Sequence, residues 1–176
     1  MKEILHRLPV RFKFALVLVL PLIALGWFAA SGAIARQAVV NELSRMQALT
    51  ALAQQAGGWV HQVQRERGMT AGFLGSQGKV FGDRLRQQRS DMDAAAEAFF
   101  QQRDQLDATL LTSTISSQLA AVEQQWQQNQ SLRDQVDLLS VATPEALGHY
   151  TGLNSLLMVL VGELAHLTGE GAITRQ

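Results

Sequence analysis

Residues 64–74 read QRERGMTAGFL, and this stretch decides how the first helix of the chain is interpreted. It continues a stripe of residues that recur at alternating steps of four and three positions, which is the spacing of a buried seam on an α-helix. The stripe consists of Leu49, Ala53, Ala56, Val60, Val63, Arg67, Thr70 and Leu74. The pattern predicts a long amphipathic helix that carries one arginine, Arg67, on its buried face.

A buried Arg67 needs an anionic partner, because a guanidinium keeps its proton in proteins. One interpretation is an anion bound between helices. The alternatives are a side chain that reaches out to water, or an ion pair with an acid such as Glu66, Asp91, Asp134 or Asp137. Spacing alone leaves these interpretations open.

Three glycines follow Arg67 at helical spacing, namely Gly68, Gly72 and Gly75. Glycine inside a helix is less favourable than alanine by about 1 kcal/mol, so its use there needs a compensating reason. We expect these three positions to allow close packing of a neighbouring segment against the helix.

The composition excludes several classes of protein. The chain has 176 residues, no cysteine, and 15 basic against 15 acidic residues, so disulfides, thiolate metal sites and a net field that attracts nucleic acid are excluded. Alanine, leucine and glutamine are abundant, and no segment alternates with the period of a strand. The expected fold class is all-α.

Residues 14–35 form an uncharged apolar stretch, FALVLVLPLIALGWFAASGAIA. A helix of this length crosses a hydrocarbon core of about 30 Å, so we expect an uncleaved transmembrane helix. The alternative is a signal peptide cleaved after residues 33–35, Ala-Ile-Ala. More basic residues precede the stretch than closely follow it, which places residues 1–13 in the cytoplasm and residues 36–176 outside.

Three further helices are predicted after the first. One runs from about Val80 to Leu106, the next begins after the hydroxyl-rich residues 112–114, and the last opens at residues 143–145, Thr-Pro-Glu, with a cap, a first-turn proline and an acid. The apolar run at residues 156–161 of the last helix is too short for a second span. The prediction is an N-terminal transmembrane helix followed by an up-down four-helix bundle.

A second arginine, Arg133, falls on the heptad stripe of the third bundle helix. A competing face defined by Leu132, Val136 and Leu139 would turn Arg133 sideways. If Arg133 and Arg67 both face the interior, they converge on one small planar oxyanion, to which each donates a two-pronged hydrogen bond.

Patterns for catalysis or metal binding are weak. The sequence has no Gly-rich phosphate loop after a strand and no nucleophile elbow, so no enzymatic activity is expected. Glu163 and His166 have the Glu-x-x-His spacing of a carboxylate-bridged metal site, but one such pair supplies about a quarter of a site. We predict neither a metal nor a cofactor.

The stretch QRERGMTAGFL at residues 64–74 resembles the signature of the NIT family, the nitrate- and nitrite-sensing helical domain. Residues 132–137, LRDQVD, residues 144–147, PEAL, and residues 150–151 resemble the family's second characteristic region in order and spacing. The resemblance covers about Ala48 to Gly171. Members of this family occur in bacterial receptors, commonly methyl-accepting chemotaxis receptors, and also in sensor kinases, cyclases and an antiterminator.

The resemblance implies that Arg67 and Arg133 contact the anion, with Arg65 as the second candidate for the first position. Nitrate, nitrite or a similar small anion would then bind between helices of a periplasmic sensor, residues 36–176, anchored in a bacterial inner membrane. A homodimer that passes a conformational signal across the membrane is expected, with no nucleic-acid partner. The alternatives are the sensor part of a histidine kinase or cyclase, and a non-sensing, membrane-anchored helical dimerisation module.

The family domain is usually longer than the matching part of this chain. The resemblance therefore implies that residues 36–176 form an incomplete sensor domain, the N-terminal part of a chemoreceptor. A further helical part and a cytoplasmic output module are expected to follow.

Overall fold

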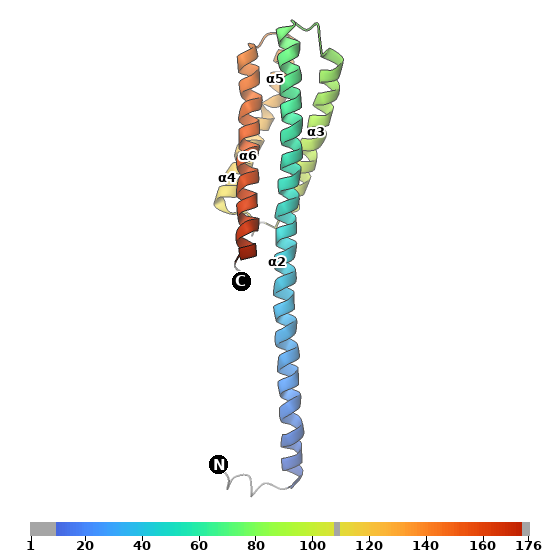
Figure 1. The fold of residues 1–176 in the computed structure, drawn as a ribbon, viewed down its shortest axis with the longest axis vertical. Coiled ribbons are helices and arrows are strands. Elements are labelled where there is room, and N and C mark those ends of the chain that lie inside the picture. Colours follow the sequence, from blue (N-terminus) through green and yellow to red (C-terminus); the bar gives the residue numbers. More distant parts are fainter. Residues whose placement is uncertain (1–9, 108–109, 174–176) are drawn as a thin grey trace. The chain divides into compact units, whose positions relative to one another are not determined.

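The computed structural model of the chain describes residues 10–107 and 110–173. They form the helices α2 (Val10–Gly75), α3 (Gly82–Asp104), α4 (Ser113–Gln127), α5 (Asn129–Asp137) and α6 (Thr143–Ile173), joined by short connections (Figure 1). These two ranges contain no strand, so the predicted all-α class is confirmed. The chain divides into two units, Met1–Ser44 and Arg45–Gln176.

The first unit contains the N-terminal part of α2, in which large apolar side chains are exposed. Trp27 is 74% and Phe28 is 79% exposed. Two helices have the length and composition of a membrane span, α2 over Pro21–Gly75 and α6 over Thr143–Gly169. Because α6 buries a complete apolar face within the second unit, we assign it to the bundle, which leaves the apolar part of α2 as the candidate span.

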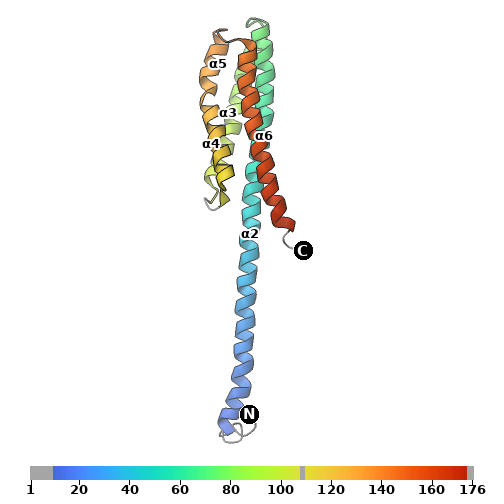
Figure 2. The ribbon, with the colours of Figure 1, turned by 90° about the vertical axis from the view of Figure 1, so that its left-hand side faces the viewer.

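The second unit is a bundle of four helical segments. The C-terminal part of α2, α3, the pair α4 and α5, and α6 lie side by side in two perpendicular views (Figures 1 and 2). The segments α4 and α5 together form the predicted third helix, which is interrupted at Gln128. The predicted four-helix arrangement therefore holds, with one break that heptad spacing did not indicate.

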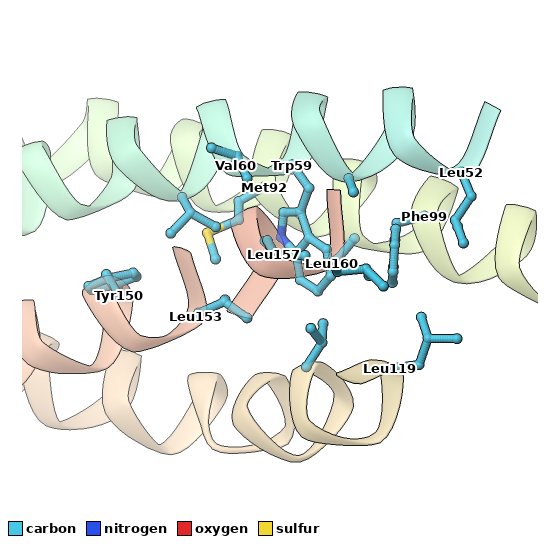
Figure 3. Packing of buried hydrophobic residues seen from close by; sticks show 14 of the residues in the cluster. Leu52, Trp59, Val60, Met92, Phe99, Leu119, Tyr150, Leu153, Leu157 and Leu160 are labelled. Carbon is cyan, nitrogen blue, oxygen red and sulfur yellow. The ribbon is translucent and has the colours of Figure 1, made fainter. Parts of the chain in front are cut away.

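Aromatic rings fill the centre of this bundle around Trp59, which is fully buried (Figure 3). Its ring centroid lies 5.3 Å from that of Phe99, 5.5 Å from that of Phe100 and 5.1 Å from that of Trp126. The first pair is tilted and the other two are edge-on, and edge-on ring pairs at these separations are favourable beyond the area they bury. Around them pack leucines from α6, all with no exposed surface: Leu153, Leu157, Leu160 and Leu164.

One position on the α2 stripe differs from the prediction. Val63 and Thr70 are buried as expected, but Arg67 is exposed, and the neighbouring Glu66 is the residue with no exposed surface. An α-helix has about 3.6 residues per turn, so its buried face drifts from a strict heptad. Glu66 takes the interior position because a cation, Arg133, is available there to pair with it.

The stripe on α5 agrees with the first of the two predicted phases. Asn129, Arg133 and Val136 are buried, and Leu132 joins them, whereas Leu139 is exposed. Arg133 therefore faces the interior of the bundle.

Two helices end in the same turn, with a non-glycine residue in the left-handed region. After α2, Gly78 N–H donates to the Phe73 carbonyl (2.8 Å) and Gln77 N–H to the Leu74 carbonyl (3.0 Å), with φ 53° at Gln77. This is the paired bonding of a Schellman cap, in which glycine is the favoured residue. After α5 the same pattern places Leu139 at φ 52°.

We expect Gln77→Gly to raise the free energy of unfolding by about 0.5–1 kcal/mol, because glycine avoids the steric cost of the left-handed conformation. Gln77 is exposed, so little packing is lost. The matched control is Gln87→Gly, an exposed glutamine within α3, which should instead lower stability by about 1 kcal/mol. Urea unfolding followed by tryptophan fluorescence measures both, and the same sign for the two variants would contradict the cap.

Candidate functional site

The charged centre of the bundle is an ion pair between Glu66 on α2 and Arg133 on α5. Arg133 Nε donates to Glu66 Oε1 at 2.8 Å, and Arg133 Nη2 donates to Glu66 Oε2 at 2.7 Å. The Glu66 side chain is 0% exposed and the Arg133 side chain is 5% exposed. This is the bidentate geometry in which guanidinium and carboxylate bind most strongly, and it compensates two charges that have lost their water.

Two further hydrogen-bond acceptors of Arg133 come from α3. Arg133 Nη1 donates to Asp93 Oδ1 at 2.6 Å, and Nη2 also reaches the carbonyl of Arg89 at 3.3 Å. Arg89 in turn donates to Asp137 at 2.7 Å. Burial by itself would lower the pKa of Arg133, but the hydrogen bonds and negative charges of Glu66 and Asp93 raise the pKa above its ordinary value. Arg133 is therefore a charged residue whose donors are largely occupied within the chain.

Tyr150 on α6 completes this centre. Its hydroxyl donates to Glu66 Oε1 at 2.8 Å and accepts from Thr70 Oγ1 at 3.5 Å. Burial, followed by the negative charge of Glu66, raises the pKa of Tyr150 above its ordinary value. The hydroxyl therefore stays protonated and remains a donor. The cluster links α2, α3, α5 and α6 through Glu66, Asp93, Arg133 and Tyr150.

Arg67 lies on a different surface, in a groove between α2 and α6. The groove has a volume of about 440 Å³ and is lined by Gln64, Arg67, Thr151 and Asn154. Arg67 makes no ion pair or hydrogen bond with any part of the chain that the structure describes. Its guanidinium is the cation that remains available to a ligand in this groove.

Asn154 and Thr151 also contribute polar atoms to the lining of this groove. Asn154 Oδ1 is buried and has no partner among the described residues, so one end of its amide is unsatisfied. The Thr151 hydroxyl donates to the Leu147 carbonyl at 2.7 Å, so it retains only acceptor capacity. The donors for an anion here are therefore Arg67, Gln64 and, with its amide rotated, Asn154.

The structure does not bring the two predicted arginines to one cavity. Arg67 lines the groove, whereas Arg133 is paired in the interior behind it. Arg65 is exposed on α2 and donates to Gln62 on its own helix at 3.5 Å. An anion-contacting role for these three arginines stays a prediction, and their positions favour Arg67 for direct contact.

The three glycines of α2 differ in their surroundings. A Cβ at Gly72 would lie 2.5 Å from the ring of Phe81, so the close approach expected there is made by an aromatic side chain. At Gly68 and Gly75 a Cβ would meet no described atom within 4 Å. Close packing of a neighbouring segment at these two positions therefore stays a prediction.

Sequence reasoning missed Glu66 and Tyr150 as members of the charged centre. Glu66 was one of several acids that could pair with an interior arginine, and spacing along one helix gives no distance to another. The signal was the acid inside QRERG next to a predicted seam, together with a tyrosine that opens the apolar stripe of α6. A buried carboxylate needs both a cation and a hydroxyl donor, and these two positions supply them.

A second polar groove, of about 470 Å³, lies where α4 and α5 meet α6, and His149 is among the residues that line it. Gln125 Nε2 donates to His149 Nδ1 at 3.0 Å, so the imidazole is an acceptor at this nitrogen. Burial lowers the pKa of His149, and the negative charge of Glu66 opposes this only partly. The folded state therefore favours the neutral ring.

His149 should make the free energy of unfolding depend on pH. The unfolded chain takes up a proton near pH 6.5, whereas the folded chain does so at lower pH, so the free energy of unfolding should fall as the pH drops below about 6.5. His149→Gln should remove part of this loss, measured as the difference in melting temperature between about pH 7.5 and pH 5. His61→Gln, at an exposed histidine of α2, should retain the wild-type slope, and identical slopes in all three proteins would refute the assignment.

Metal ligands do not gather in the described ranges: no three His, Asp or Glu side chains there are placed to hold one ion. The Glu163 and His166 pair of the sequence therefore gains no further ligands in this part of the chain. The groove that presents the Arg67 guanidinium is the candidate ligand site.

Comparisons with known proteins agree with the bundle and its motif. The profile of the NIT family, described as nitrate and nitrite sensing, matches residues 59–176. Among solved structures, the NasR transcription antiterminator is similar, with a TM-score of 0.67 and 25% identity over 80% of this chain and 37% of that chain. The chain thus spans little more than a third of NasR, and no curated protein matches it. The matched region includes the Glu66, Arg67, Arg133 and Tyr150 positions, and the chain belongs to the NIT family.

Proposed function

We propose that this chain is the sensing region of a bacterial transmembrane receptor and that nitrate or nitrite binds in the groove between α2 and α6. The observation that carries the proposal is Arg67, a guanidinium without an internal partner in the described chain, on a groove with two side-chain amides. A guanidinium offers parallel N–H donors at the spacing of two oxygens of a planar anion. The family description supplies the ligand class.

In this proposal Arg133 acts indirectly. Its donors are accepted by Glu66, Asp93 and the Arg89 carbonyl, so it would have to break a buried ion pair before it could hold an anion. Breaking such a pair costs about 3–5 kcal/mol, which an anion bound at Arg133 would have to offset before any net binding resulted. Arg133 instead holds Glu66 in place, one residue from Arg67.

Signal transfer requires that the ligand binds one arrangement of helices better than another. Because the groove joins α2 to α6, an anion that bridges Arg67 and Asn154 favours the arrangement in which these helices approach each other. The exposed apolar part of α2 in the first unit is consistent with a membrane span. A chemoreceptor with a cytoplasmic output module, present as a homodimer, is the form of receptor we propose.

The test is isothermal titration of the detergent-solubilised chain with nitrate and nitrite, with chloride and sulfate as control anions. Wild type should bind nitrate or nitrite saturably. Arg67→Ala should weaken binding about tenfold or more, because a charge-assisted, bidentate contact is lost. Arg45→Ala is the matched control, since it removes an exposed arginine of the same helix outside the groove.

Absence of nitrate and nitrite binding in wild type would support the competing interpretation, a helical membrane-anchored module whose arginines have only structural roles. The ion pair of Arg133 already agrees with that interpretation for one arginine. Equal weakening by Arg67→Ala and Arg45→Ala would show that the effect is general electrostatics and would reject the groove.

A further inference from the structure

Glu66 and Tyr150 each lie one residue before a residue that lines the groove. Glu66 precedes Arg67 on α2, and Tyr150 precedes Thr151 on α6. Both side chains have no exposed surface, and the Tyr150 hydroxyl donates to Glu66 Oε1 at 2.8 Å. The groove and this bond therefore join the same two helices at the same level.

The carboxylate end of this bond is rigid. Arg133 holds both oxygens of Glu66, at 2.8 and 2.7 Å, and is itself held by Asp93 of α3 at 2.6 Å. A side chain fixed by several partners keeps its position when one neighbour moves. Through Tyr150, a charged cluster that also contacts α3 and α5 thus holds α6 in position relative to α2.

We propose that Tyr150 and Glu66 are positioning residues of the anion groove, which fix the spacing between Arg67 on α2 and Asn154 on α6. The inference rests on the proposed function of the groove. A small anion contacts groups from both helices only when their separation is held within a fraction of an ångström. Without the buried bond the helices sample wider separations, and nitrate keeps its contact with Arg67 alone.

Tyr150→Phe tests the inference, because it removes the hydroxyl and keeps the ring that packs in the core. The full chain in detergent is titrated with nitrate. We expect the dissociation constant for nitrate to rise about fivefold, because the net free energy of one hydrogen bond that fixes the helix spacing is lost. The control is Thr112→Ala, which removes the hydroxyl that caps α4 through the Ile115 N–H and lowers stability away from the groove. Its nitrate affinity should equal that of wild type.

A second measurement does not depend on ligand. The chain has no cysteine, so spin labels attached through His61→Cys on α2 and Ser155→Cys on α6, both exposed positions, report one distance between the helices. Tyr150→Phe should broaden this distance distribution, and Thr112→Ala should leave it unchanged.

The outcomes separate the two proposals. If wild type binds nitrate and Tyr150→Phe binds it equally well, or shows an unchanged distance distribution, the positioning role is overturned and the groove stands. If wild type binds neither nitrate nor nitrite, the proposed function fails and the inference fails with it. Weaker binding together with a broader distance in Tyr150→Phe, and neither effect in Thr112→Ala, supports the positioning role.

Discussion

Replacing Glu66 by alanine is expected to lower the free energy of unfolding of the bundle by about 3–5 kcal/mol, because it leaves a buried guanidinium without its main partner. Arg133 would keep the contact with Asp93, whose side chain is 52% exposed, the carbonyl of Arg89 and the ring of Trp126, 5.7 Å away. The Tyr150 hydroxyl would lose its acceptor as well. Urea unfolding of the detergent-solubilised chain, followed by tryptophan fluorescence, measures the loss.

The control for Glu66→Ala is Glu97→Ala, which removes an exposed acid of α3 and should change stability by less than about 0.5 kcal/mol. The double variant Glu66→Leu with Arg133→Met removes both charges and should cost less than the two single changes added together, because no unpaired charge stays buried. A loss below about 1 kcal/mol in Glu66→Ala would place the pair among surface salt bridges and contradict its burial.

Replacing Trp59 by alanine is expected to cost about 3–5 kcal/mol, as for other large aromatic side chains removed from a core. Trp59 is fully buried and its ring contacts Phe99, Phe100 and Trp126. The cavity left by the indole would lie between three of the four helical segments, where the surrounding rings cannot all collapse into it. The midpoint of urea unfolding, with circular dichroism as the probe, gives the value.

Trp59→Phe is the matched control. It keeps an aromatic ring at the centre and removes Nε1, which is buried without a partner among the described residues. Loss of an unsatisfied donor offsets part of the lost volume, so the cost should stay below about 1.5 kcal/mol. Equal losses for the alanine and phenylalanine variants would mean that the packing of these rings does not determine stability.

The fold was largely predictable because its helices carry clean apolar stripes. On α6 every predicted stripe position from Tyr150 to Leu164 is buried, because the burial of apolar leucine side chains is favourable. The Thr112 hydroxyl caps α4 as expected, accepting from the Ile115 N–H at 3.2 Å. These features depend on residues that are close together in the sequence, so the sequence alone predicts them.

The candidate site was less predictable, because the burial of a charged residue depends on partners from other helices. Spacing placed Arg67 on the seam of α2, and the structure buries Glu66 there because Arg133 faces it from α5. The break at Gln128 and the left-handed residue at Leu139 likewise depend on how neighbouring helices must meet. Heptad counting along one helix contains no information on these distances.

We propose that Arg67, and not Arg133, contacts the anion. Heteronuclear NMR of the arginine Nε–H groups tests it most directly, with each signal assigned by its loss in Arg67→Lys or Arg133→Lys. On titration with nitrate, the Arg67 signal should shift saturably while the Arg133 signal keeps its position, because Arg133 Nε already donates to Glu66 at 2.8 Å. A saturable shift of the Arg133 signal with no change at Arg67 would contradict the account.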